Sequence, residues 1–234
     1  MTRSRHDRSL SFGSAAAAYE RGRPSYPPEA IDWLLPRGAR HVLDLGAGTG
    51  KLTTRLVERG LDVVAVDPIP DMLEVLRTSL PETRALLGTA EEIPLEDNSV
   101  DAVLVAQAWH WVDPERAIPE VARVLRPGGR WVFSVTHPVR WCLPDDPGPA
   151  GLTVTRSYFD RRAYVEQDDS GRATYVEHHR TLGDRVREIR AAGLVLADLV
   201  EPEWPAEAAR EWGHWSRLRG ELIPGTAILV CVKP

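Results

Sequence analysis

The sequence predicts an α/β fold in which helices cover both faces of a doubly wound, mostly parallel sheet. Two observations lead to this prediction: short apolar runs alternate along the chain with helical segments, and a glycine-rich loop joins the first run to the first helix. Such alternation specifies parallel strands joined by right-handed crossovers. With 234 residues, of which 43% are hydrophobic, the chain is long enough to bury one full core, and we expect a single domain over 1–234.

The expected elements follow one another in a regular order. Apolar, β-branched runs predict strands at 41–45, 62–67, 84–88, 100–106 and 130–136, and the segments between them predict helices at 50–59, 70–79 and 115–125. A helix at 181–192 ends before Gly193, a residue type that favours the left-handed turn after a helix, and strands at 194–200 and 226–232 come last. Before the first strand, 12–35 should hold helical pieces around a proline-rich break.

The loop after the first strand combines three alternating glycines with an acidic residue. Gly46, Gly48 and Gly50 remove Cβ atoms where the backbone must pass close to a ligand, and the next helix points its first N–H groups into the same crevice. Asp44 precedes the first glycine by two positions, and a carboxylate there suits a cationic ligand better than a pyrophosphate. The last two glycines are also one residue too close for the dinucleotide pattern G-x-G-x-x-G.

A second acidic residue ends the next expected strand. Asp67 follows the run 63–66, about twenty residues after the loop, which is the spacing at which a carboxylate accepts hydrogen bonds from ribose hydroxyls. The run Asp44–Gly50 also matches acid-x-Gly-x-Gly-x-Gly, the first motif of the class I S-adenosylmethionine (SAM) dependent methyltransferases. The chain resembles that family over 12–136, and is closest to the type 11 group, which includes ubiquinone and menaquinone biosynthesis enzymes.

The resemblance implies a Rossmann-like, seven-stranded sheet with an antiparallel hairpin of the last two strands at its edge, and SAM as the cofactor. It assigns the adenine contacts to Thr89–Glu91, after the third strand, and the contacts to the cofactor carboxylate to Tyr19 and Arg23, in an N-terminal cap segment over 1–35. The expected cofactor-binding residues are Tyr19, Arg23, Asp44, Gly46, Ala47, Gly48, Thr49, Gly50, Asp67, Pro68, Met72, Thr89, Ala90, Glu91, Gln107 and Ala108.

Two connections, 137–180 and 201–225, are longer than usual for a compact domain, and long connections are usually functional. We interpret 137–180 as a substrate lid, because it follows the fifth strand at the end of the sheet where ligands bind. Alternating residues at 153–155 and 173–176 predict a short β-hairpin within it. A structural flap or a dimer surface is the alternative interpretation of this segment.

The implied reaction is the in-line attack of an O, N, S or C nucleophile on the methyl group of SAM. A histidine can serve as general base where the nucleophile is a hydroxyl. His110 follows the fourth strand, His137 follows the fifth, and His178 and His179 end the lid, so these four are the candidate catalytic residues. Supporting carboxylates for a metal site are not recognisable in the sequence, and we expect no metal.

The segment after the fourth strand helps to predict which class of molecule accepts the methyl group. Methyltransferases that act on the amino groups of adenine, cytosine or glutamine often carry an Asn/Asp-Pro-Pro-aromatic motif there, whereas this chain has Gln107–His110. The formal net charge of −5 also disfavours nucleic acid as the main partner. We therefore expect a small-molecule acceptor, apolar or aromatic because the two long connections are rich in aromatic residues.

No apolar run approaches the length of a membrane span, the basic start Met1–Arg5 is not followed by a signal-peptide core, and two cysteines give no disulfide framework. We therefore expect a cytoplasmic protein. Three other functions remain open: a non-catalytic SAM-fold protein that binds a ligand or partner, an NAD(P)-dependent oxidoreductase, and an aminopropyl transferase. Intact Asp44 and Asp67 argue against the first, the glycine spacing argues against the second, and no acidic residues stand out after the fourth strand for a polyamine.

Overall fold

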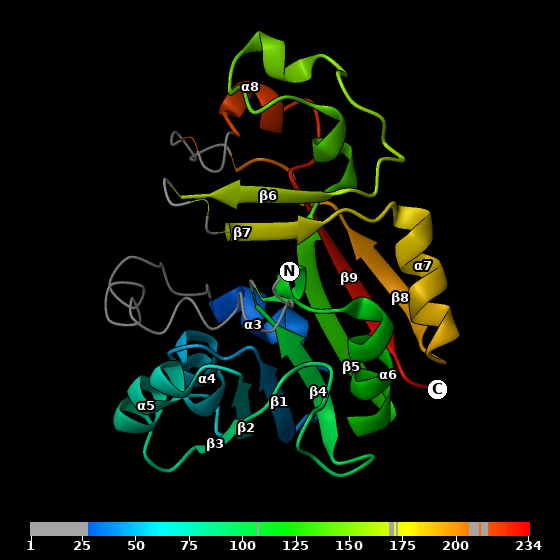
Figure 1. The fold of residues 1–234 in the computed structure, drawn as a ribbon. Helices are drawn as coiled ribbons and strands as arrows, with labels where there is room; N and C mark the ends of the chain where they lie inside the picture. The colour runs from blue at the N-terminus through cyan, green and yellow to red at the C-terminus, as the bar shows by residue number, and fades with distance from the viewer. Residues whose placement is uncertain (1–27, 107, 169–170, 172, 206–210, 212–214) are drawn as a thin grey trace.

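The computed structural model describes residues 28–106, 108–168, 171, 173–205, 211 and 215–234. They form one seven-stranded sheet in the order β3-β2-β1-β4-β5-β9-β8 and a separate two-stranded sheet (Figure 1). The strands of the large sheet are β1 (His41–Leu45), β2 (Asp62–Asp67), β3 (Arg84–Leu87), β4 (Val100–Val105), β5 (Leu125–Thr136), β8 (Val195–Val200) and β9 (Thr226–Val232). β1 to β5 pair in parallel, whereas β9 runs antiparallel to both β5 and β8. The predicted fold class, including the antiparallel edge hairpin, is confirmed.

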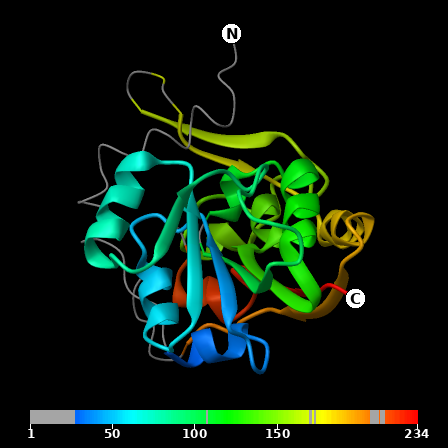
Figure 2. The same cartoon turned by 90° about the horizontal axis from the view of Figure 1, so that it is seen from below.

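Helices cover both faces of this sheet (Figure 2). α3 (Pro28–Leu34) precedes β1, and α4 (Lys51–Val57), α5 (Pro70–Ser79), α6 (Pro114–Val124) and α7 (Leu182–Ala191) connect successive strands. Successive side chains of a strand point to opposite faces, so each strand contributes to two cores. On one face Val42 packs with Ile31 of α3 and Leu56 of α4, and on the other Leu43 belongs to the cluster with Ile118 of α6 and Ile189 of α7.

The strand order reverses direction at the carboxyl ends of β1 and β4, the position at which an open α/β sheet is expected to hold a ligand crevice. From β1 the chain crosses over to β2 and β3 on one side, and from β4 it crosses to β5 on the other. In open α/β sheets this reversal of direction separates the two connections and leaves room for a ligand. The glycine loop leaves β1 at this point, and a short 3₁₀ helix, η2 (Trp109–Trp111), follows β4.

The segment 137–180 extends beyond the carboxyl ends of the strands (Figure 1). It contains the 3₁₀ helices η3 (Pro138–Cys142) and η4 (Pro149–Leu152) and the antiparallel hairpin of β6 (Ala163–Gln167) and β7 (Ala173–His178). η4 lies against α8 (Arg217–Gly220) from the second long connection, and β7 lies against η2.

The prediction of a strand at 153–155 is wrong, although the hairpin itself is present and 173–176 lies in β7. Residues 153–155 have no regular structure, because their backbone bonds locally: Thr153 N–H bonds the carbonyl of Ala150 and Thr155 N–H bonds that of Cys142. Val154 between them is 70% exposed, so the alternation does not bury an apolar side chain there. The strand that pairs with β7 is β6.

Candidate active site

The three glycines of the loop after β1 are required for different reasons. All have positive φ, the backbone region that side chains rarely adopt. A Cβ on Gly46 would lie 2.4 Å from the Cβ of Ala108 after β4, and one on Gly50 would lie 2.9 Å from Cγ of Leu76 in α5. At Gly48, with φ +56, no described atom lies within 4 Å of that position. Gly46 and Gly50 therefore allow close packing, and Gly48 leaves one side of the loop open.

Asp67 at the end of β2 holds this loop in place. Its Oδ2 accepts the N–H of Gly48 at 2.8 Å, and its Oδ1 accepts the N–H of Ile69 at 2.9 Å. Burial raises the pKa of this carboxyl, and the two backbone hydrogen bonds oppose the rise. A carboxylate oxygen can accept more than one hydrogen bond, so both oxygens retain capacity for ribose hydroxyls.

Asp44 lies beneath the loop and is 1% exposed. Its Oδ2 accepts the hydroxyl of Thr53, in the first turn of α4, at 2.6 Å. Burial raises the pKa of Asp44 to about 7, the hydrogen bond from Thr53 works against this, and the charge of Asp67 adds to it. A cationic ligand beside Asp44 would favour the ionised carboxylate.

The expected adenine loop follows β3. Ala90 is buried, Thr89 forms an isolated β-bridge with Glu92, and Oε1 of Glu91 accepts the N–H of Asp113 at 2.6 Å. Glu91 thus ties this loop to the residue that caps α6. The remaining described candidates lie along the same edge: Ala47, Thr49 and Met72 are buried, and Pro68 and Ala108 are half-buried. Tyr19, Arg23 and Gln107 lie outside the described residues.

His110 is positioned by the aromatic residue before it. Trp109 is 2% exposed, and its ring centroid lies 4.7 Å from that of Trp131 and 5.1 Å from that of Phe133, both on β5. This contact anchors η2 to the sheet and leaves His110 half-buried, with its ring centroid 5.0 Å from that of Trp111. His110 therefore lies at the carboxyl end of β4, next to the crevice and to β7.

His137 follows β5 but is bound within the protein. Its Nδ1 accepts the N–H of Val139 at 3.2 Å, so the ring proton is on Nε2, which lies 2.7 Å from Oε1 of Glu201. Burial lowers the pKa of His137, and the adjacent Glu201 opposes this. Nδ1 thus caps the start of η3, and Nε2 attaches the end of β5 to Glu201 in the second long connection.

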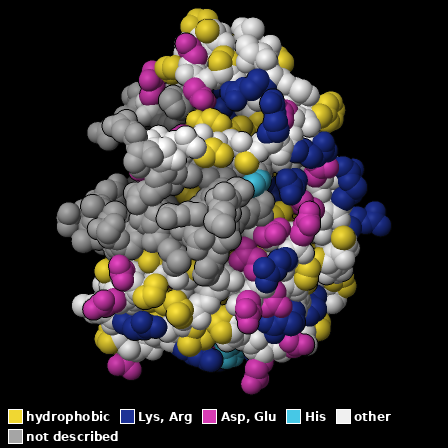
Figure 3. Space-filling view, in the orientation of Figure 1, with side chains coloured by type: hydrophobic (Ala, Val, Ile, Leu, Met, Phe, Trp, Pro, Cys, Tyr) yellow, Lys and Arg dark blue, Asp and Glu magenta, His cyan; other side chains and the backbone are white. Residues whose placement is uncertain are grey.

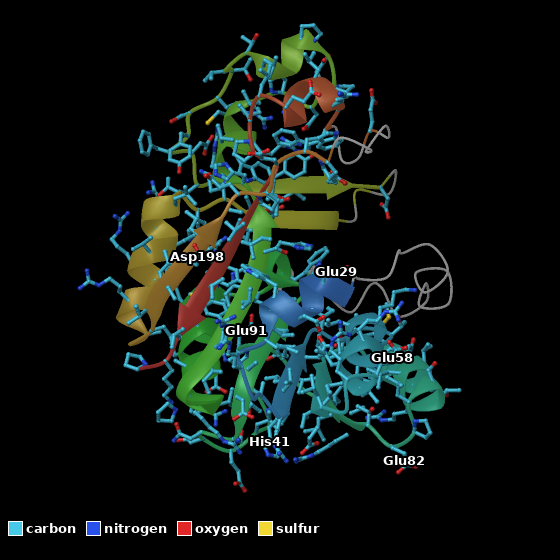
Figure 4. All side chains as sticks on the ribbon, turned by 180° about the vertical axis from the view of Figure 1, so that it is seen from behind. Glu29, His41, Glu58, Glu82, Glu91 and Asp198 are labelled. Atoms are coloured by element: carbon cyan, nitrogen blue, oxygen red, sulfur yellow. The ribbon has the colours of Figure 1, made fainter. Side chains whose placement is uncertain are left out.

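The two histidines at the end of the lid differ from each other. His179 is buried, its Nε2 lies 2.6 Å from the carbonyl of Tyr158, and its Nδ1 has no hydrogen-bond partner among the described residues. Burial lowers the pKa of His179. His178 is half-buried and pairs with Ala163 across the hairpin. His41 lies at the amino end of β1, far from the crevice (Figure 4).

Sequence reasoning missed three polar contributors. Thr53 and Glu177 are buried, and Glu177 on β7 lies 3.4 Å from the hydroxyl of Thr136 at the end of β5. Glu201, the partner of His137, is 64 residues away in the sequence. Only Thr53 has a local signal, because it falls in the first turn of the helix that the glycine loop opens.

Comparison with known protein families gives a match over the part of the chain that contains the glycine loop and Asp67. Residues 43–133 match the family model described as a methyltransferase domain. These residues are a methyltransferase domain. The family resemblance expected from the sequence is confirmed over these residues, and the described candidates at the glycine loop, Asp67, the adenine loop and η2 all lie within them.

Relatives of the methyltransferase domain are found among proteins and solved structures. An uncharacterized methyltransferase of Mycobacterium tuberculosis is 88% identical over 130 residues, 56% of this chain and 54% of that protein. A demethylmenaquinone methyltransferase of Thermus thermophilus is 38% identical over 139 residues, 56% of this chain and 60% of that protein. A SAM-dependent methyltransferase structure from Mesorhizobium loti has a TM-score of 0.68 and 25% identity, covering 88% of this chain and 96% of that one. The chain spans about half the length of the first of these relatives.

Replacing Asp67 by alanine should weaken SAM binding by at least tenfold, because charge-assisted hydrogen bonds to the ribose contribute about 1.5–3 kcal/mol. The free energy of unfolding should also fall by about 1–3 kcal/mol, because the N–H groups of Gly48 and Ile69 lose their acceptor. Calorimetry and denaturant unfolding measure the two effects. Asp62→Ala is the control at the other end of β2, where the carboxylate contacts the exposed His41, and it should leave affinity unchanged. A folded Asp67→Ala variant with wild-type affinity would exclude Asp67 as a ribose ligand.

Proposed function

We propose that this protein transfers the methyl group of SAM to a small-molecule acceptor. The observation that carries the proposal is the pair of buried carboxylates, Asp44 and Asp67, at the loop of Gly48, whose Cβ position has no described atom within 4 Å. Two negative groups favour a cationic ligand with a ribose and disfavour a pyrophosphate. The hydroxyl of Thr53, at the start of α4, also donates to Asp44, so that this first turn is occupied by a carboxylate of the chain itself.

In this proposal the cofactor is SAM, whose sulfonium supplies the activated methyl group. The chain binds it in three parts. Asp67 accepts hydrogen bonds from the ribose, the loop Thr89–Glu91 contacts the adenine, and Asp44 provides negative charge for the cationic portion. Because the methyl group is already activated, the remaining tasks are to align the acceptor and to exclude water.

Among the four candidate histidines, we give the first place as general base to His110. It lies directly after β4 on a 3₁₀ helix anchored by Trp109, and its ring is half-buried beside the crevice. His137 and His179 are less suited to proton transfer, because hydrogen bonds hold the ring of His137 to Glu201 and Val139 and that of His179 to Tyr158. His178 remains a second candidate, from the end of β7.

Calorimetric titration of the full chain with SAM, S-adenosylhomocysteine (SAH) and NAD tests the proposed function. We expect SAM and SAH to bind and NAD to give no measurable heat of binding. NAD binding as tight as that of SAM would overturn the proposal in favour of an oxidoreductase. If SAM binds but no methyl group reaches any compound in a screen of small hydroxyl, amine and thiol acceptors with radiolabelled SAM, the protein is a non-catalytic SAM-binding protein.

Replacing His110 by asparagine should lower kcat for the acceptor found in that screen by about 100-fold, the usual contribution of a positioned base. SAH affinity and the melting temperature should stay close to wild type. His137→Asn is the matched comparison, and it should instead lower the free energy of unfolding by about 1–2 kcal/mol, because it breaks the contact with Glu201. Initial rates, SAH titration and thermal unfolding separate the two variants. Wild-type kcat in His110→Asn would remove His110 from the reaction.

We retain 137–180 as a lid over the acceptor site. Its hairpin has only two strands, a bulge at Glu166–Gln167 and an exposed Val165, and isolated two-stranded sheets are marginally stable. Backbone amides of β6 and β7 should therefore exchange hydrogen faster than those of β1 and β4, and slow down when SAH or acceptor binds. Exchange measured by mass spectrometry checks this. If neither SAH nor the acceptor changes the hydrogen-exchange rate of the hairpin amides, the interpretation as a structural flap is favoured.

The proposal also includes the expected class of acceptor, the cellular location and the single-domain organisation. A small-molecule acceptor is supported by the likeness to a demethylmenaquinone methyltransferase over 56% of this chain. Basic and acidic side chains are intermixed over the described part of the face in Figure 3, which agrees with an acceptor other than nucleic acid.

The expected location in the cytoplasm agrees with the state of the cysteines, because Cys142 and Cys231 are buried free thiols. Within the described residues, no helix is long and apolar enough to cross a membrane. The common seven-stranded sheet supports a single domain.

A further inference from the structure

Thr53 is the residue through which α4 contacts the Asp44 carboxylate. It is fully buried in the first turn of the helix, and its Oγ1 donates to Oδ2 of Asp44 at 2.6 Å. A short hydrogen bond between two buried groups fixes the orientation of both, because no water competes for them. The backbone N–H of Thr53 bonds to the same carboxylate. Within the described part of the chain, the hydrogen bonds that act on Asp44 therefore all come from Thr53.

We propose that Thr53 is a positioning residue, which holds the Asp44 carboxylate ionised and oriented toward the cationic part of the cofactor. This inference rests on the proposed function, because it assumes that a cation binds beside Asp44. Thr53 itself would not touch the cofactor. It acts through Asp44, by making the charged form of a buried carboxyl less unfavourable.

The electrostatics of the site show why this help is needed. Burial favours the protonated form of Asp44, and the negative charge of Asp67 on β2 acts in the same direction. Among the described groups, Asp67 is the charged residue that acts on Asp44 in this way, and only the hydrogen bonds from Thr53 oppose it. Removing the hydroxyl would keep Asp44 protonated to a higher pH and weaken its attraction for a cation.

The test is a series of SAM titrations by calorimetry between pH 5.5 and 8.5 on the full chain. For the wild type, SAM affinity should rise with pH and level off above about pH 7, as Asp44 ionises. In Thr53→Val the rise should move up by about one pH unit, and affinity should fall about fivefold at pH 7 and about tenfold at pH 6. Thr53→Ser, which keeps the hydroxyl, should restore the wild-type curve.

Thr54→Val is the matched control. Thr54 is the next residue of the same turn, and its Oγ1 donates to the carbonyl of Gly50 at 2.9 Å, not to a carboxylate. The SAM affinity of Thr54→Val should stay within twofold of wild type at every pH. Two results would overturn the inference and show that the Thr53 side chain only packs. One is a loss of SAM affinity in Thr53→Val that is equal at every pH. The other is a pH shift of the affinity curve in Thr54→Val as large as that in Thr53→Val.

Thermal unfolding without ligand separates this inference from the proposed function. The melting temperature should fall as pH rises from about 4 to about 7, and in Thr53→Val this fall should continue to higher pH because the folded-state pKa of Asp44 is higher. If the wild type binds no SAM but the melting curves still shift in this way, the proposed cofactor is wrong and the role of Thr53 toward Asp44 stands. If the melting curves of Thr53→Val and Thr54→Val change alike with pH, the role of Thr53 is excluded whatever the cofactor.

Discussion

Valine at position 48 is expected to abolish SAM binding, with a loss of more than 100-fold in affinity. The side chain would project from the open side of the loop, where no described atom lies within 4 Å, into the space that the proposed cofactor needs. It would also force a β-branched residue to adopt φ +56, at a cost of about 1–2 kcal/mol in the free energy of unfolding. Calorimetry with SAH and denaturant unfolding measure the two effects separately.

Gly60→Val is the control for that experiment. Gly60 has φ +73, also has no described atom within 4 Å of its Cβ position, and lies in the exposed turn between α4 and β2, at the amino end of the sheet. Both variants should lose similar stability, but only Gly48→Val should lose binding. If Gly48→Val binds SAH as well as Gly60→Val does, the loop does not approach the cofactor closely.

The second large expected effect is a pH-dependent gain in the free energy of unfolding when Asp44 is replaced by asparagine. Folding raises the pKa of Asp44 from 3.8 to about 7, so between these values the folded chain holds a proton that the unfolded chain has released. The stabilisation from this proton is complete below pH 4, falls as pH rises, and is lost above pH 7. Asp44→Asn has no such titration and should therefore become more stable than the wild type by up to about 4 kcal/mol above pH 7, with little difference near pH 4.

Denaturant unfolding at pH 4, 6 and 8 without ligand measures this difference. Asp62→Asn, which replaces an exposed carboxylate on the neighbouring strand, controls for the general loss of one negative charge. The gap between Asp44→Asn and the wild type should widen with pH, while that for Asp62→Asn should not. Parallel curves for Asp44→Asn and the wild type would mean that Asp44 titrates normally in the folded chain.

The strands and the cofactor loop could be predicted from the sequence because their signals are local. The run that ends at Asp67 is apolar and β-branched on a strand buried on both faces, so its pattern survives in the fold. The glycines between β1 and α4 are likewise dictated by the backbone, as their positive φ values show. These features depend on residues that are near one another in the chain.

The features that the sequence did not reveal depend on distant contacts. Three alternating residues at 153–155 look like a strand, but pairing is decided by what lies opposite β7, and that is β6. His137 has the position of a catalytic base, yet its contact with Glu201 comes from a segment 64 residues away. Thr53 is the exception, because it lies close to Asp44 in the sequence and falls in the first turn of the helix that the glycine loop opens.

The hairpin of β6 and β7 shares no backbone ladder with the seven-stranded sheet in the described part of the chain. Its length and sequence can therefore change without altering the register of β1, β4 or β5, on which the described cofactor candidates depend. The protein is modular in this sense: among the described residues, hydrogen-bonded strand pairing does not couple the hairpin to the strands of 43–133, and β7 meets this part of the chain at η2. If the proposed lid contacts the acceptor, exchanging this hairpin between relatives is a route to new acceptors that leaves the strand register of the sheet unchanged.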